Sequence, residues 1–283
     1  MATDNNIYGY DPSIPAAGIF IVLFGISTAY HLYQLIKARA LYFIPFVIGG
    51  IFQILGYIFR ILSHDKTDSV PLYALQTVLI LLAPALYAAS IYMVLGRLIV
   101  HLAAEQHSLV RVNWMTKIFV TGDVISFLMQ CGGGGLMSSD DHSTVKIGET
   151  ITIIGLAVQI VFFGFFIITA IVFHIRINKS PTVMSTETKG QWRGNITARN
   201  WVTLLLAMYV VSVLILVRSV FRMVEFIDGY GGYIMSHEVF IYIFDAVLMV
   251  IVMAILNFWH PSFVIRDGKG SATRGDFEQV PLR

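Results

Sequence analysis

The stretch LILVRSVFRMVEF, residues 214–226, sets charged side chains inside an apolar frame. Arg218, Arg222 and Glu225 fall within an arc of about 60° on an α-helix, so they share one face. Such a face is ordinary in a soluble protein, whereas in a membrane its charges are costly unless they are paired. The composition of the whole chain decides between these two cases.

The chain is far more apolar than a soluble domain. Of its 283 residues, 57% are hydrophobic and 13% are charged, against about 25% charged residues in an ordinary domain. Apolar runs near the ~20 residues that a membrane helix needs recur along the sequence. They cover residues 14–36, 41–62, 73–96, 118–137, 150–173, 201–224 and 237–258. The sequence therefore predicts an all-α, polytopic membrane protein, a bundle of seven transmembrane helices.

The first run is expected to be a membrane helix and not a secretion signal, because Asp4 and Asp11 precede it in place of basic residues. Residues 1–261 are predicted to form one transmembrane domain. Residues 262–283 contain Gly268, Gly270 and mixed charges, and this composition is typical of a disordered tail.

Basic residues alternate between the predicted loops. The loops of one side hold 14 Lys and Arg residues, whereas those of the other side hold Lys66 and Lys146. Because cytoplasmic loops carry the excess of Lys and Arg, the basic side is predicted to be cytoplasmic. The N-terminus then lies outside and the C-terminal tail inside.

The remaining basic residues lie within predicted helices, near the outer side, together with several carboxylates. In the last run, a spacing of i, i+4, i+7 places two acidic residues and a tyrosine on one face. We expect Glu225 to contact Arg60 or the outer loop. The candidate residues of this layer are Arg60, Arg218, Arg222, Glu225, Glu238, Tyr242 and Asp245.

Intramembrane charges face the interior of a bundle and pair with one another, so Arg218 or Arg222 is predicted to pair with Glu238 or Asp245. Two interpretations remain open. The layer could be a structural clamp between helices, or it could also line an outward-facing pocket for the headgroup of an amphiphile. A third possibility is that Arg222 extends to the outer interface.

A second polar stripe follows the fourth run, where Asp123, Ser126 and Gln130 share one face. It leads into the sequence QCGGGG, residues 130–135. Four consecutive glycines weaken a helix. The run could be unwound against a wet cavity, or the helix could end at Gly132.

The third run carries Pro84, which leaves the carbonyl of Ile80 without its usual helical donor. Gln76, Tyr87 and Ser90 lie near one face of this helix. A kinked helix with a polar face suits a cavity, although packing alone also explains a proline in a membrane helix.

Sequence patterns of common enzymes are missing from the chain. It contains no HExxH, GxSxG or Walker-type loop. No two of its eight histidines share a predicted helix at a spacing of three or four residues, and the single cysteine, Cys131, excludes a disulfide within the chain. We therefore expect a protein that is not an enzyme, with no cofactor, no metal and no nucleic-acid partner.

Four blocks resemble the fungal lipid-translocating exporter family, also called the resistance-to-aminocholesterol family. The helix with QTVLILLAPALYAASIYMVLGRLI (76–99) and the helix with TGDVISFLMQCGGGG (121–135) match its first two motifs. RSVFRMVEFIDGYGG (218–232) and HEVFIYIFDAVLMVIVMAILNFWHP (237–261) match the others. The resemblance implies seven helices, an outside N-terminus and the handling of membrane lipids.

The resemblance implies that amphiphilic lipids are the partners of this protein, with export of sphingoid long-chain bases or of sterol-like toxic amphiphiles as the expected function. A porphyrin transporter and a seven-helix lipid sensor are the alternatives, and the plasma membrane is the expected location. The charged layer suits either ligand: its carboxylates could bind a sphingoid amine, and its arginines could bind porphyrin propionates.

Overall fold

The structure is a computed structural model that describes residues 12–64, 69–137, 139, 141–189, 200–229, 232–234 and 237–265. The regular structure of these residues is helical. The helices are α1 (Ile14–Ala38), α2 (Ile44–Leu62), α3 (Val70–His101), α4 (Val112–Leu136), α5 (His142–Lys179), α6 (Val183–Lys189), α7 (Trp201–Asp228), α8 (Glu238–Ile241) and α9 (Leu248–Phe258). Three short 3-10 turns accompany them: η1 (Leu41–Phe43), η2 (Glu105–His107) and η4 (Pro261–Phe263).

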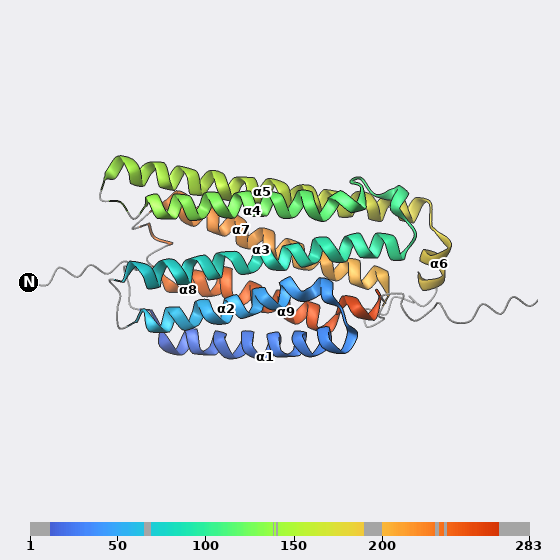
Figure 1. The fold of residues 1–283 in the computed structure, drawn as a ribbon, viewed down its shortest axis with the longest axis horizontal. Coiled ribbons are helices and arrows are strands. Elements are labelled where there is room, and N and C mark those ends of the chain that lie inside the picture. Colours follow the sequence, from blue (N-terminus) through green and yellow to red (C-terminus); the bar gives the residue numbers. More distant parts are fainter. Residues whose placement is uncertain are drawn as a thin grey trace, which may run out of the picture.

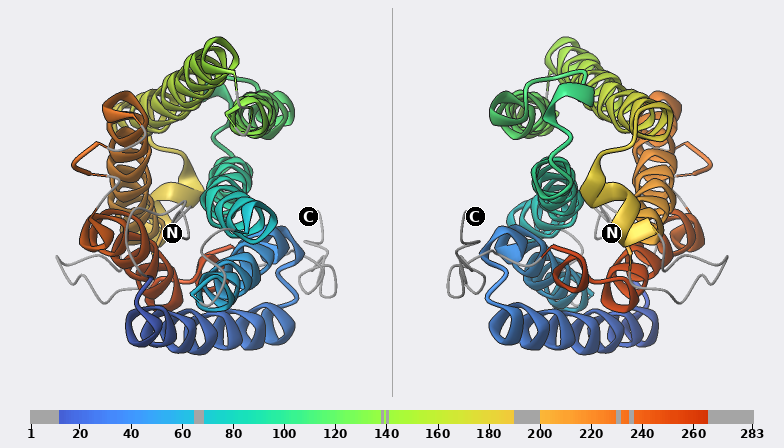
Figure 2. Two further views of the ribbon diagram at one scale, coloured as in Figure 1. Left: turned by 90° about the vertical axis from the view of Figure 1, so that its left-hand side faces the viewer. Right: turned by 90° about the vertical axis from the view of Figure 1, so that its right-hand side faces the viewer.

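A π-helical turn, η3 (Tyr242–Val247), joins α8 to α9, so the chain from Glu238 to Phe258 is one continuous helix. The long helices run antiparallel along a common axis (Figure 1). Seen along that axis, α1 and α2 lie on one side of the bundle and α4 and α5 on the opposite side, with α3 and α7 between them (Figure 2). The short helix α6 lies across one end.

Six helical segments of the described residues are long and apolar enough to cross a membrane. Helix α4 is more polar, but its 25 residues carry the chain back from the end where α3 stops to the end where α5 starts (Figure 1). The predicted all-α, polytopic membrane architecture is confirmed. Each predicted run corresponds to one long helix. The helix that extends farthest beyond its predicted run is α5, whose 38 residues span about 57 Å.

Local sequence explains where several helices begin. The side chain of Asp141 accepts hydrogen bonds from the backbone N–H groups at the start of α5, as a helix cap does. Asn200 and Thr203 form a capping box at the start of α7. These polar caps lie outside the apolar runs, which is why hydropathy alone placed the start of α5 too late.

The glycine run of α4 is helical, so both expectations for it are wrong: the chain neither unwinds there nor ends its helix at Gly132. A Cβ on Gly133 would lie 2.6 Å from the carbonyl oxygen of Gly148 on α5 and 2.9 Å from the backbone nitrogen of Thr152. Gly133 therefore allows α4 and α5 to approach each other closely, as small residues commonly do between membrane helices.

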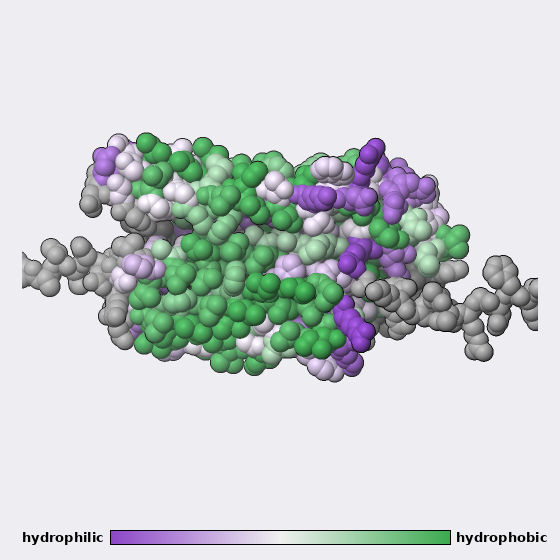
Figure 3. Space-filling model, in the orientation of Figure 1, coloured by the Kyte–Doolittle hydropathy of each residue, from purple (hydrophilic) through white to green (hydrophobic). Residues whose placement is uncertain are grey.

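Apolar side chains cover the middle of the visible face, and polar ones gather at one end of the bundle (Figure 3). This end, called the basic end below, is where α1, α3 and α5 finish. It carries Lys37, Arg97, Lys117, Arg176 and Lys179. The alternation of basic loops thus corresponds to two ends of the fold, while their assignment to cytoplasm and exterior stays a prediction.

Described structure continues past α9 through η4 to Ile265, which is buried. Residues 266–283 lie outside the described residues, so the disordered tail stays a prediction. The same is true of the domain boundary at residue 261.

The predicted topology can be tested by glycosylation. Asn178 and Asn195 begin the two Asn-x-Ser/Thr sequences of the chain, both in the connection at the basic end. If that end is cytoplasmic, endoglycosidase should not shift the protein on a gel. Asp141→Asn creates Asn-His-Ser in the opposite loop and should add a removable glycan; a glycan mapped to Asn195 would invert the topology.

Candidate functional site

Arg218 and Arg222 of α7 both bind Asp245, which lies in the π-helical turn η3. The Nε of Arg218 donates to Oδ1 of Asp245, and its Nη2 donates to Oδ2 at 3.3 Å. Nη2 of Arg222 lies 2.7 Å from the same Oδ2. The predicted pairing of α7 with the last helix is confirmed. The π-helical turn contributes to the placement of Asp245, as such turns often do at specialised sites.

Glu225 pairs within its own helix. The Nη1 of Arg222 donates to Oε2 of Glu225 at 2.8 Å, a contact that their spacing of three residues allows. The expectation that Glu225 meets Arg60 or the outer loop is therefore wrong. Arg222 bridges Glu225 and Asp245, so it ties α7 to η3.

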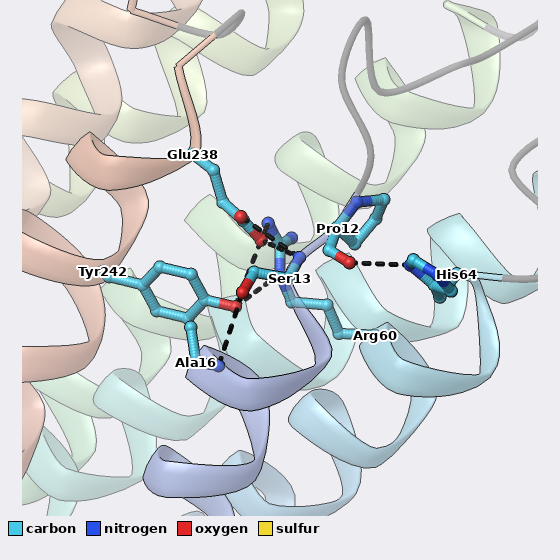
Figure 4. Close-up of polar contacts among 7 residues, drawn as sticks. All are labelled: Pro12, Ser13, Ala16, Arg60, His64, Glu238 and Tyr242. Carbon is cyan, nitrogen blue, oxygen red and sulfur yellow. Dashed lines mark hydrogen bonds and ion pairs between the residues drawn. The ribbon is translucent and has the colours of Figure 1, made fainter.

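Arg60 of α2 has a different carboxylate partner, Glu238 at the start of α8 (Figure 4). Nη2 of Arg60 donates to Oε1 of Glu238 at 2.8 Å, and its Nε donates to the hydroxyl of Tyr242 at 3.2 Å. Glu238 also accepts the backbone N–H of Ser13 at 2.9 Å. This contact fixes the start of α1 to both α2 and α8.

Among the described residues these ion pairs form two groups, Arg60 with Glu238 and Arg218 and Arg222 with Glu225 and Asp245, which are together called the arginine–carboxylate cluster below. Glu238 is 16% exposed at its side chain, and the other members are buried. The formal charges of these six described side chains cancel. Paired and hydrogen-bonded charges of this kind hold helices in one arrangement.

Pro84 has a specific role in this cluster. The Ile80 carbonyl, which Pro84 deprives of its helical donor, accepts a hydrogen bond from Nη2 of Arg218 at 3.1 Å. The same guanidinium thus satisfies a backbone oxygen on α3 and a carboxylate on η3. The proline was a usable sequence signal for a donor near Ile80, although it did not identify Arg218.

Two other candidates lie in a helix interface. The Tyr87 hydroxyl donates to Sδ of Met253 on α9 at 3.1 Å, and its ring packs on Phe46. Gln76 is buried where α3 passes Gly56 of α2. Both side chains belong to the packing of α2, α3 and α9.

The polar stripe of α4 faces the interior as predicted, since Asp123, Ser126 and Gln130 are buried. Nε2 of Gln130 donates to Oγ of Ser126 at 2.7 Å and to Oε1 of Gln159 at 3.1 Å. The hydroxyl of Tyr92 donates to Oδ2 of Asp123 at 2.9 Å. Tyr92 and Gln159 were missed by the sequence analysis, although Gln159 interrupts an apolar run.

A cavity of about 430 Å³ opens between α3, α4, α5 and the end of α7, away from the basic end. This volume lies within the range of small-molecule sites. Of the eleven candidate residues, Gln130 lines it. Its other polar lining includes Tyr73, Thr77, Cys131 and Thr152, and no charged side chain occurs among the described residues that line it.

Comparison with known proteins finds relatives of this chain in yeast. The family described as "RTA1 like protein" matches residues 46–268. Protoporphyrin uptake protein 1 of Saccharomyces cerevisiae is 37% identical over 282 residues, covering 87% of this chain and 89% of that protein. Protein RTA1 of that yeast is 36% identical over 281 residues, covering 90% and 85%.

A third relative, the sphingoid long-chain base transporter RSB1 of Saccharomyces cerevisiae, is 28% identical over 290 residues, covering 94% of this chain and 76% of that protein. No solved structure matches the chain. Two of these three relatives are named for uptake or transport, and none is named for an enzymatic reaction.

Proposed function

The chain belongs to the RTA1-like protein family, and we propose that it translocates amphiphilic lipids, with sphingoid long-chain bases as its substrate class. We place it in the plasma membrane. The proposal is supported by a membrane-embedded bundle that contains a ligand-sized cavity and by a relative named as a sphingoid long-chain base transporter.

The cavity carries this proposal, because its lining suits a chain with neutral polar groups. Apolar side chains such as Val78, Leu81 and Phe226 offer contact to a hydrocarbon chain. The hydroxyl of Thr77 and the amide of Gln130 are hydrogen-bonding groups for the hydroxyls of a sphingoid base. The charged headgroup is then expected to lie at the mouth of the cavity, in reach of water.

A porphyrin is the second candidate, since the protein named for protoporphyrin uptake shares more identity with this chain than the sphingoid base transporter does. The cavity offers it no cation, because no charged side chain occurs among the described residues that line it. A porphyrin brings two propionates, while the arginines Arg60, Arg218 and Arg222 are already neutralised by carboxylates.

Blocking the cavity should stop transport. A Cβ on Gly134 has no neighbour within 4 Å, and Gly134 lines the cavity, so Gly134→Leu should fill it without disturbing α4. Transport of a fluorescent sphinganine by purified protein in vesicles should fall on the order of tenfold, which corresponds to about 1.4 kcal/mol of lost binding. Protoporphyrin IX should be tested in the same transport assay, so that the two candidate substrates can be compared.

Gly132→Leu is the matched control. Gly132 lies half a turn away on α4, also has open space at its Cβ, and does not line the cavity. It should transport like the unmodified protein. Equal rates for the two leucine variants would show that the substrate does not use this cavity.

Binding can be measured apart from movement because the chain has one cysteine, and Cys131 lines the cavity. Sphinganine should slow the reaction of Cys131 with a membrane-permeant maleimide. Protection together with flux supports a transporter, and protection without flux supports a lipid sensor. Protection by protoporphyrin IX alone would favour the second candidate substrate.

A further inference from the structure

Asp123 differs from every other buried carboxylate of the described bundle. It is 5% exposed, its Oδ2 accepts one hydrogen bond from Tyr92, and its Oδ1 has no hydrogen-bond partner. No described residue forms an ion pair with it, whereas Asp245 is held by Arg218 and Arg222. A carboxylate buried without a cation is costly, and such a group takes up a proton instead.

Aromatic rings pack against the tyrosine that binds this carboxyl group. The Tyr92 ring that binds it lies 4.6 Å from Phe166, 5.3 Å from Phe119 and 6.1 Å from Phe163, measured between ring centroids. Asp123 lines neither of the two large cavities. A proton reaches such a place more readily than a lipid amine, which needs room for its chain.

Nearby titratable groups offer no substitute cation. In residues 77–96 of α3, 118–136 of α4 and 155–173 of α5, the titratable side chains besides Tyr92 and Asp123 are Tyr87 and Cys131. The arginines of α7 bind the carboxylates of the cluster. Lys117, six residues before Asp123, is exposed at the basic end, and Arg97 there lies over the ring of Tyr42.

Asp123 also lies midway between two openings of the bundle. A second cavity, of about 680 Å³, opens between α3 and α4 at the basic end and is lined by Thr116. Gln130 lines the first cavity toward the other end. Thr116, Asp123 and Gln130 are spaced by seven residues, which places them near one face of α4 at intervals of about 10.5 Å.

Polar side chains continue from Asp123 toward the first cavity, and apolar residues separate it from the second. On one side, Ser126 binds Gln130. On the other side, Tyr92 is followed by Met93 and, one turn later, by Gly96, both of which line the second cavity. This face of α4 therefore carries buried polar side chains from Asp123 to Gln130, whereas the buried ring of Phe119 lies between Thr116 and Asp123.

We propose that Asp123 is a proton-exchange site that communicates alternately with the two cavities and couples lipid movement to a proton gradient. This coupling rests on the proposed transport function. In the exchange, a hydronium ion that reaches Asp123 from one cavity transfers its proton to the carboxylate, which leaves water and a neutral carboxyl group. The O–H bond breaks again when water of the other cavity accepts the proton, and no electron transfer is involved.

Infrared spectroscopy tests the proton on Asp123 without any transport. The protein in lipid should show a carboxyl C=O band that shifts in D2O and is missing in Asp123→Asn. Tyr92→Phe keeps the carboxyl group but removes its hydrogen bond, so it should displace the band even if Asp123→Asn folds poorly. Asp228→Asn, at an exposed acid, is the control and should leave the band in place. An unchanged band in both Asp123→Asn and Tyr92→Phe would overturn the proposal.

A flux measurement tests the coupling. The probe is a labelled N-trimethyl sphingoid base, whose fixed charge carries no proton of its own. If one probe molecule exchanges for one proton, the probe should accumulate up to about tenfold for each unit of pH difference across the membrane of vesicles that carry the unmodified protein. Asp123→Asn should lose this response, and a response like that of the unmodified protein would contradict the coupling. If no protein moves the probe while the infrared band behaves as expected, the transport function fails and the proton site stands.

Discussion

Asp245→Ala should destabilise the protein more than any other single change in the arginine–carboxylate cluster. It leaves Arg218 and Arg222 buried without their shared carboxylate. Removing one partner of a buried ion pair costs about 3–5 kcal/mol, because the other charge is stranded. Thermal unfolding in detergent and the yield of monodisperse protein measure the loss, and Asp228→Asn, at an exposed acid of α7, should change neither quantity.

The contacts also predict which second substitution restores stability. Arg218→Gln combined with Asp245→Asn removes one arginine and one carboxylate and leaves the pairs Arg222–Glu225 and Arg60–Glu238 complete. The glutamine amide can still donate toward the Ile80 carbonyl. This double variant should recover much of the lost stability.

Arg222→Ala combined with Asp245→Asn has the same formal charge but a different outcome. It removes the partner of Glu225 and leaves Arg218 without a carboxylate, so two buried charges stay unpaired. We expect it to be at least as unstable as Asp245→Asn alone. Equal recovery by both double variants would show that only the net charge of the cluster counts.

The rescued variant also separates the two interpretations of the cluster. If the ion pairs only clamp α2, α7 and α8 together, Arg218→Gln with Asp245→Asn should regain lipid transport along with stability. If the cluster binds a headgroup, stability should return while transport stays low. The neutrality of the cluster favours the clamp.

Hydropathy predicted the long helices well because an apolar run of about 20 residues has few other uses. It placed the helix ends poorly. Helix α5, for example, runs from His142 to Lys179 and has polar residues at both ends. The signal for its start is the side-chain cap at Asp141. The π-helical turn at Asp245 depends on packing against α7, and periodicity in the sequence carries no trace of it.

The candidate site was predictable only in part. Helical spacing correctly placed Arg218 and Arg222 on one face, near the depth of Asp245, but it left the choice of partners open. That choice depends on contacts between helices that are far apart in sequence, such as Arg60 with Glu238. The cavity beside Gln130 was expected only as one alternative for the same reason, because its lining comes from four helices and has no sequence period of its own.

The glycine run of α4 gives the second large effect on stability. Gly133→Ala should destabilise the bundle, because its Cβ would meet Thr152 and the carbonyl oxygen of Gly148 on α5. Overpacking of this kind costs about 1–3 kcal/mol, and here backbone atoms of α5 must move to relieve it. Thermal unfolding of the purified protein in detergent measures the change.

Gly132→Ala, one residue earlier, separates the effect of the contact between α4 and α5 from the higher helix propensity of alanine. Its Cβ meets nothing within 4 Å, so it should be neutral or stabilise α4 by about 0.5–1 kcal/mol. Opposite signs for two adjacent alanines would establish that α4 and α5 touch at Gly133 in the membrane protein. Equal stability of the two variants would mean that these helices lie farther apart than their backbone contact requires, and the side chains of Gln130 and Gln159 would then be too far apart to hydrogen-bond.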